Sequence, residues 1–161
     1  CEAERGFIQT KGVPPMHLNL TRTLLATATV LAFTAMPAYA EMLKFSADLK
    51  GASEVPPTDS AGTGKVEATL DTDSKVFTWT VTYEGLSGDA TGAHFHGPAA
   101  AGANADPVVP LADPLASPIN GNATLTDDQI TQLKGGQWYF NLHTAKFPDG
   151  EIRGQVMAAA M

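Results

Sequence analysis

The sequence of 161 residues contains a single cysteine, Cys1, at its first position. No disulfide can form within the chain, and beyond that position no thiolate can act as a nucleophile or a metal ligand. A domain built from the rest of the chain must therefore be stabilised by its hydrophobic core. Without its first 40 residues, which are considered below, the chain has about 120 residues, and that length is sufficient for such a core.

Basic residues are also scarce, since 10 lysines and arginines stand against 17 aspartates and glutamates, a net charge of −7. An acidic surface repels phosphate backbones, and no basic stripe interrupts it, which argues against binding to nucleic acid or to anionic lipid. Past residue 40 there is no uninterrupted apolar run of about 18 residues. We therefore expect no membrane span in the mature form.

The first 40 residues have the composition of a targeting segment. Residues 16–40 are predicted to be a signal peptide: Met16 is a start, Arg22 is the basic region, residues 24–35 are apolar, and Ala38-Tyr39-Ala40 is a small-x-small cleavage site. Cleavage near Ala40 would give a secreted or periplasmic protein. Residues 1–15 precede this start and are interpreted as a non-native upstream extension, which leaves 41–161 as a single domain.

Within 41–161, apolar and polar residues alternate in short runs separated by clusters of glycine, proline and aspartate, a pattern typical of strands and turns. A capping box, Thr126 to Gln129, predicts one short helix over 126–134 that Gly135 ends. We expect an all-β, antiparallel, Greek-key-like β-sandwich or barrel of about seven to eight strands with one short helix. The runs lie at 45–49, 66–70, 76–83, 90–96, 108–111, 137–143 and 151–157.

Three of the four histidines occupy two short motifs, His94-Phe-His96 and the end of the run 137–143. Side chains alternate along a strand, so His94 and His96 project to one face with Cα atoms roughly 6 to 7 Å apart. In the second run Trp138, Phe140 and Leu142 share a core face, which leaves Asn141 and His143 on the opposite face. If both runs belong to one sheet, three imidazoles converge.

Three convergent imidazoles predict a site for a mononuclear metal ion bound by His94, His96 and His143. Neutral imidazole suits copper and zinc, and without thiolates the affinity order favours copper. Three protein ligands leave a coordination position open. The alternative is that these histidines are structural and tie a loop to the sheet, in a non-catalytic module that binds an extracellular protein or a surface.

Three further polar side chains are candidates for holding such ligands in place. Asn141 shares the face of His143, while Glu151 and Arg153 alternate along the last run. A carboxylate next to a ligating imidazole fixes the orientation of the ring. For Glu151 and Arg153, a solvated cross-strand ion pair is the favoured interpretation.

No residue pattern identifies a catalytic residue. The chain has no Gly-x-Ser-x-Gly turn for a serine nucleophile, no glycine loop for a phosphate, and no spacing that singles out a pair of carboxylates. A copper site with an open position permits superoxide dismutation or another oxidation without demonstrating one. Whether the protein is an enzyme stays open at this level.

The motifs together resemble a known family. Gly51-Ala-Ser-Glu54-Val-Pro-Pro57, Ala93-His-Phe-His-Gly-Pro-Ala99, Tyr139-Phe-Asn-Leu-His-Thr144 and Gly150-Glu-Ile-Arg-Gly-Gln-Val156 are similar to the motifs of the CHRD, or chordin-type, domain. The resemblance covers about residues 43–157. It implies an exported bacterial single-domain protein, and chordin itself is an extracellular binder of signalling proteins. The resemblance does not by itself imply an enzymatic activity.

A weaker resemblance concerns motif order. His-x-His on one strand and a histidine on a late strand resemble the copper ligands of Cu/Zn superoxide dismutases, which also have a β-sandwich architecture. The pattern departs from those enzymes because no histidine lies between His96 and His143 to bridge two metals, and no cysteine pair is present. The comparison implies a mononuclear copper protein rather than a dismutase.

Overall fold

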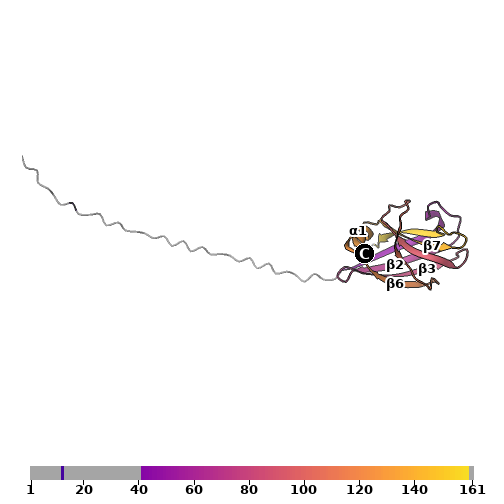
Figure 1. The fold of residues 1–161 in the computed structure, drawn as a ribbon, viewed down its shortest axis with the longest axis horizontal. Coiled ribbons are helices and arrows are strands. Elements are labelled where there is room, and N and C mark those ends of the chain that lie inside the picture. The colour runs from indigo at the N-terminus through magenta and orange to yellow at the C-terminus, as the bar shows by residue number, and fades with distance from the viewer. Residues whose placement is uncertain (1–11, 13–40, 160–161) are drawn as a thin grey trace, which may run out of the picture. The chain divides into compact units, whose positions relative to one another are not determined.

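The computed structural model describes Gly12 and residues 41–159, and the second range forms a domain of antiparallel strands (Figure 1). The regular elements there also include one α-helix, α1 (Asp127–Lys134), and a 3-10 turn, η1 (Gly51–Ser53). The predicted all-β class with one short helix is confirmed. The strands are β1 (Met42–Lys50), β2 (Thr63–Asp71), β3 (Val76–Glu84), β4 (Ala90–His96), β5 (Pro107–Pro110), β6 (Ile119–Thr124), β7 (Trp138–Thr144) and β8 (Ile152–Ala158).

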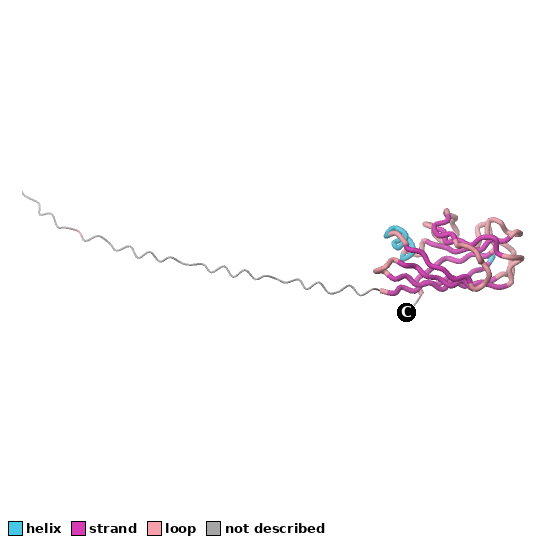
Figure 2. Tube along the Cα trace, turned by 60° about the horizontal axis from the view of Figure 1, so that its bottom comes forward, coloured by secondary structure: helices cyan, strands magenta, loops and turns pink. Residues whose placement is uncertain are grey.

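The eight strands form one sheet in the order β5-β4-β7-β8-β1-β2-β3-β6, and their recorded pairings are antiparallel. The sheet curls into a nearly closed barrel with β5 and β6 as its edges, and Figure 2 shows the strands running side by side along it. Three connections, β3 to β4, β5 to β6 and β6 to β7, join strands that are not adjacent in the sheet. These crossovers give the Greek-key-like order. A cleft of about 730 Å³ is lined by residues of both edge strands.

The core follows from the alternation of apolar residues. On β3 the side chains of Phe77, Trp79 and Val81 are buried, and their neighbours point outward. Phe77 and Phe95 meet edge-on with ring centroids 5.2 Å apart, a favourable geometry for aromatic pairs. This aromatic cluster fixes the inner face of β4, so that residues on either side of Phe95 face the other way.

The turn between β2 and β3 and the start of helix α1 follow from local sequence. Strands β2 and β3 form a hairpin, in which Asp71 accepts hydrogen bonds from the backbone N–H groups of Asp73 and Ser74. Helix α1 begins after Thr126, whose hydroxyl accepts from the Gln129 N–H while the Gln129 side chain accepts from Thr126 N–H. These bonds satisfy donors that the first helical turn leaves open.

Strand β6 does not follow from its sequence. Its segment Ile119-Asn-Gly-Asn-Ala-Thr124 has only one large apolar side chain in its alternating pattern, and asparagine and glycine are depleted in strands. The strand state arises from its pairing with β3, from Val76 opposite Thr124 to Val81 opposite Ile119. Tertiary pairing thus overrides weak local preference at this edge.

Two sequence predictions concern segments that the structure leaves out. The upstream extension 1–15 and the signal peptide 16–40 lie outside the described residues, except for Gly12. For the described part of the chain, none of the helices combines the length and the hydropathy that membrane crossing requires.

Candidate metal centre

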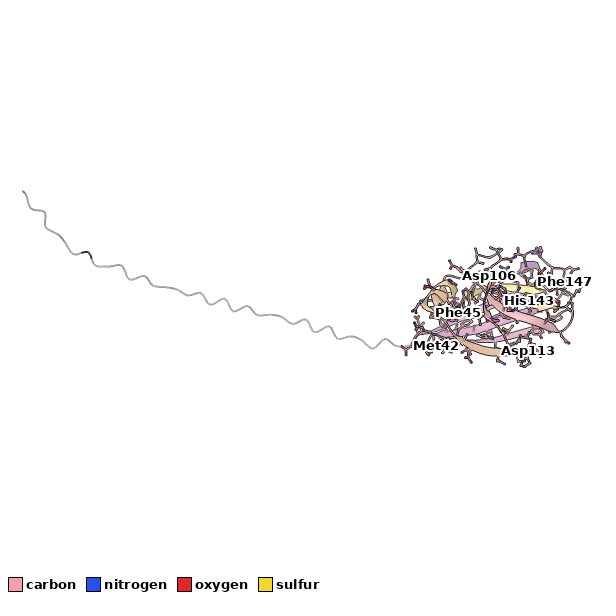
Figure 3. The ribbon with its side chains drawn as sticks, viewed as in Figure 1. Met42, Phe45, Asp106, Asp113, His143 and Phe147 are labelled. Carbon is pink, nitrogen blue, oxygen red and sulfur yellow. The ribbon has the colours of Figure 1, made fainter. Side chains whose placement is uncertain are left out.

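Three imidazoles are brought together by the pairing of β4 with β7. His94 lies opposite Asn141 and His96 opposite Tyr139, one residue out of phase with the buried pair Phe95 and Phe140. The three histidines therefore share the outer face of the sheet, and one ligand atom from each of His94, His96 and His143 lies within 4.8 Å of the others. In Figure 3, His143 lies toward Phe147 and away from Met42.

The ring protons of two imidazoles are fixed by backbone carbonyls. His96 Nδ1 lies 2.9 Å from the Ala105 oxygen, and His143 Nδ1 lies 2.9 Å from the Pro148 oxygen. A carbonyl oxygen can only accept, so Nδ1 carries the proton in both rings. In the neutral rings, the Nε2 atoms of His96 and His143 then each carry a free lone pair, and both atoms point toward the space between the three histidines.

Asn141 lies at the centre of the cluster. Its Oδ1 atom is 3.0 Å from His96 Nε2 and 3.0 Å from His143 Nε2. His94 Nδ1 completes the group at 3.1 Å from His143 Nε2. The histidine cluster, defined as His94, His96, Asn141 and His143, thus directs four potential acceptor atoms toward one region.

The surroundings of His94 and His96 favour their neutral forms. Burial lowers the pKa of His94 below its ordinary value, and charge on His143 and His96 lowers it further. Burial also lowers the pKa of His96, against the opposing effect of the hydrogen bonds that the charged ring would donate to Ala105 and Asn141. Neutral rings are the form that binds metal ions.

Arg153 supports His96 through Tyr139. The guanidinium carbon lies 3.4 Å from the Tyr139 ring centroid, and the imidazole of His96 stacks on Tyr139 with an interplanar angle of 5°. Arg153 Nη1 donates to Asn104 Oδ1 at 2.7 Å, and Nη2 donates to the Ala103 oxygen. Arg153 therefore also fixes the loop that carries Ala105.

Glu151 lies in a different cluster from the histidines. Its Oε1 accepts from the Ser60 hydroxyl and the Ser87 N–H, and its Oε2 accepts from the hydroxyls of Ser87 and Thr144. Within residues 41–159 it forms no ion pair with Arg153 and no hydrogen bond to an imidazole. Of the three supporting candidates, Asn141 alone lies within hydrogen-bonding distance of the imidazoles.

Glu54 is a site residue that sequence reasoning did not find. It is 5% exposed, and its Oε1 atom is buried without a hydrogen-bond partner among the described residues. Burial raises the pKa of Glu54 to about 7, although the Arg153 charge and the Asn141 amide pull it down. It also lines a cleft of about 440 Å³ with Pro57 and Phe147. Only its place in the Glu54-Val-Pro-Pro57 motif marked it in the sequence.

Fold and site together define an antiparallel β-barrel with a three-histidine cluster on its outer face. The chain belongs to the CHRD domain family, whose model matches residues 45–156, so the resemblance seen in the motifs is confirmed. No curated protein and no solved structure matches the chain.

Proposed function

We propose that the domain binds one transition-metal ion through His94 Nδ1, His96 Nε2 and His143 Nε2. The observation that carries this proposal is the direction of the lone pairs. Two backbone carbonyls hold the protons on the far side of the His96 and His143 rings, which leaves both Nε2 atoms facing inward. An outer partner that fixes the tautomer is a usual feature of histidine metal sites.

The spacing is close to that of a loaded site. An imidazole nitrogen lies about 2.0 Å from a bound zinc ion, so two ligands of a tetrahedral ion are about 3.3 Å apart. The ligand atoms here span at most 4.8 Å. A contraction of up to about 1.5 Å closes the set. The half-buried rings of His94 and His143 leave a route for the ion and an open coordination position.

Copper is the metal we favour, with zinc as the alternative. Imidazole serves both ions, and the affinity order for divalent ions places copper above zinc at a site of this kind. The role we propose is copper handling, or a redox role whose substrate is not defined, in a secreted or periplasmic protein. The predicted signal peptide and the CHRD family support export.

A metal titration of the purified, metal-stripped protein tests this proposal. We expect one equivalent of Cu(II) to bind, and the His96→Ala variant to bind at least tenfold more weakly. Asn122→Ala serves as a control, because this exposed side chain on β6 lies on another strand pair. Absence of stoichiometric binding, or equal binding by His96→Ala, would reject the proposal.

The structural interpretation of the histidines has its own supporting observation. The bonds from His96 to Ala105 and from His143 to Pro148 tie two loops to the sheet, as expected of a binding module that presents loops to a partner. In that case His143→Ala should lower the melting temperature of metal-free protein by several degrees while wild type binds no metal. Stoichiometric copper binding by wild type decides against it.

A further inference from the structure

The side chain of Asn141 has two unlike ends, and only one of them suits a cation. Its Oδ1 atom faces the Nε2 lone pairs of His96 and His143 at 3.0 Å each. Acceptors that face one another without a proton repel, and a cation between them removes the repulsion. The reversed amide would instead donate Nδ2–H to the same lone pairs and would favour an empty site.

The other end of the amide lies beside Glu54. A side-chain carbon at Gly150 would collide with both Glu54 Oε1 and Asn141 Nδ2, which is 2.8 Å from that position. Gly150 has a φ of +133° and no side chain, so the carboxyl and the amide nitrogen can approach the same small space. An ionised carboxylate only accepts, so in this position it selects Nδ2 as the atom that faces it.

We propose that Glu54 is a positioning residue: its carboxylate holds the Asn141 amide with Nδ2 outward and Oδ1 toward the metal. This inference rests on the proposed function, since it names what prepares that site for a cation. Burial raises the pKa of Glu54 to about 7 against the charge of Arg153, so the carboxylate acts in this way above about pH 7. The chain from Glu54 through Asn141 therefore sets whether the histidine cluster presents an acceptor or a donor at its centre.

Exchange of the carboxylate for an amide tests this inference directly. Glu54→Gln has almost the same shape but can donate to Asn141 Oδ1, which would turn the amide round. We expect its affinity for Zn(II) and for Cu(II) to fall by about 10- to 100-fold. Glu151→Gln is the matched control: it also removes a buried carboxylate, but one that touches no imidazole, and we expect unchanged affinity.

A second substitution separates orientation from charge. Asn141→Asp has oxygen at both ends, so in the Glu54→Gln background it accepts from the introduced amide and still offers oxygen to the ion. We expect this double variant, which has the wild-type net charge, to regain most of the lost affinity. In an Asn141→Ala background, Glu54→Gln should add no further loss, as expected of a residue that acts through another.

The direction of the amide can also be observed directly, without an affinity measurement. In the zinc-loaded wild type, nuclear Overhauser effects from the Asn141 Nδ2 protons should reach the Gly150 α-protons. In Glu54→Gln they should instead reach ring protons of His96 and His143. Unchanged affinity in Glu54→Gln overturns the inference, and so does a loss of affinity without reversal of these contacts, because charge alone would then explain it.

The inference and the proposed function can fail separately. Normal copper binding by both wild type and Glu54→Gln removes the role of Glu54 and leaves the metal site in place. If wild type binds neither Zn(II) nor Cu(II), the proposed function fails. Reversal of the amide contacts in metal-free Glu54→Gln would then still support the control of Asn141 by Glu54.

Discussion

Two buried carboxylates in this barrel, Glu151 and Glu54, have opposite surroundings. Glu151 is 0% exposed and both of its oxygens accept hydrogen bonds, whereas Glu54 is 5% exposed and its Oε1 has no partner among the described residues. Burial alone would raise the pKa of Glu151, but hydrogen bonds from Thr144, Ser87 and Ser60 outweigh it and lower that pKa. Burial dominates at Glu54 and raises its pKa to about 7.

The difference separates a structural cluster, around Glu151, from the cluster that we propose to be functional. Glu151 joins three segments that are distant in sequence, at Ser60, Ser87 and Thr144, and the Thr58 hydroxyl donates to its backbone oxygen. A buried polar network with all its groups satisfied gives rigidity. Glu54 and the histidine cluster lack such closure, and unsatisfied buried groups with shifted pKa values are typical of functional sites.

The largest expected effect concerns acid release of the metal. Protons compete with the ion for three imidazoles whose ordinary pKa is about 6.5, so well below that pKa the affinity should fall by up to about three powers of ten per pH unit. We expect Cu(II) to leave between roughly pH 6 and pH 4. Equilibrium dialysis measures this, and full retention at pH 4.5 would exclude His94, His96 and His143 as the ligand set. Glu151→Gln should release copper at the same pH.

A large loss of stability should follow from Glu151→Gln. The amide keeps the shape of the side chain but loses the charge that strengthens four hydrogen bonds, each worth about 1.5 to 3 kcal/mol when a charged group takes part. Because the serine and threonine hydroxyls can rotate to accept from an amide, we expect a net loss of about 3 kcal/mol. Urea unfolding of metal-free protein checks it, and a loss no greater than that of Asn122→Ala would contradict the structural role of this cluster.

Stability should depend on pH through Glu54 in the sense opposite to an ordinary carboxylate. The folded protein keeps the Glu54 proton up to about pH 7, whereas the unfolded chain releases it near 4.5. The folded state therefore binds more protons in this window, so the free energy of unfolding contributed by Glu54 falls as pH rises through it, by up to about 2 to 3 kcal/mol.

Comparison with Glu54→Gln isolates this contribution. The lowered pKa values of His94 and His96 act in the opposite direction, since the unfolded chain protonates first as pH falls below 6.5, and the two proteins share that effect. We expect wild type to lose stability relative to Glu54→Gln between pH 4.5 and pH 8 in the presence of a chelator. A difference that stays constant over this range would show that Glu54 does not titrate there.

Much of the barrel and the histidine cluster followed from periodicity. The alternation that buries Trp138, Phe140 and Leu142 also places Asn141 and His143 on the opposite face, and it does the same for His94 and His96 around Phe95. Local chemistry was also sufficient for the capping box at Thr126. These features depend on residues that are close in sequence.

What the sequence could not predict depends on contacts between distant segments. Glu54 meets Asn141 only because Gly150 leaves room between them, and no local pattern pairs residues so far apart. The same holds for Glu151: alternation placed it beside Arg153, but its partners come from two loops and the end of β7. Strand β6 likewise exists through its partner β3 rather than through its own residues.

The smallest expected effect separates two tasks within the histidine cluster. His143 donates from Nδ1 to the Pro148 oxygen, whereas Nδ1 of His94 lies 3.1 Å from His143 Nε2 and His94 makes no contact to a backbone carbonyl among the described residues. In metal-free protein His143→Ala should therefore cost about 1 kcal/mol, or a few degrees in melting temperature, and His94→Ala should cost less. Both variants should lose the rise in melting temperature that Cu(II) gives the wild type. Differential scanning calorimetry with and without copper measures both quantities.

Equal losses in metal-free His94→Ala and His143→Ala would show that the bond to Pro148 does not anchor the loop. A copper-induced rise that persists in His94→Ala would remove that residue from the ligand set.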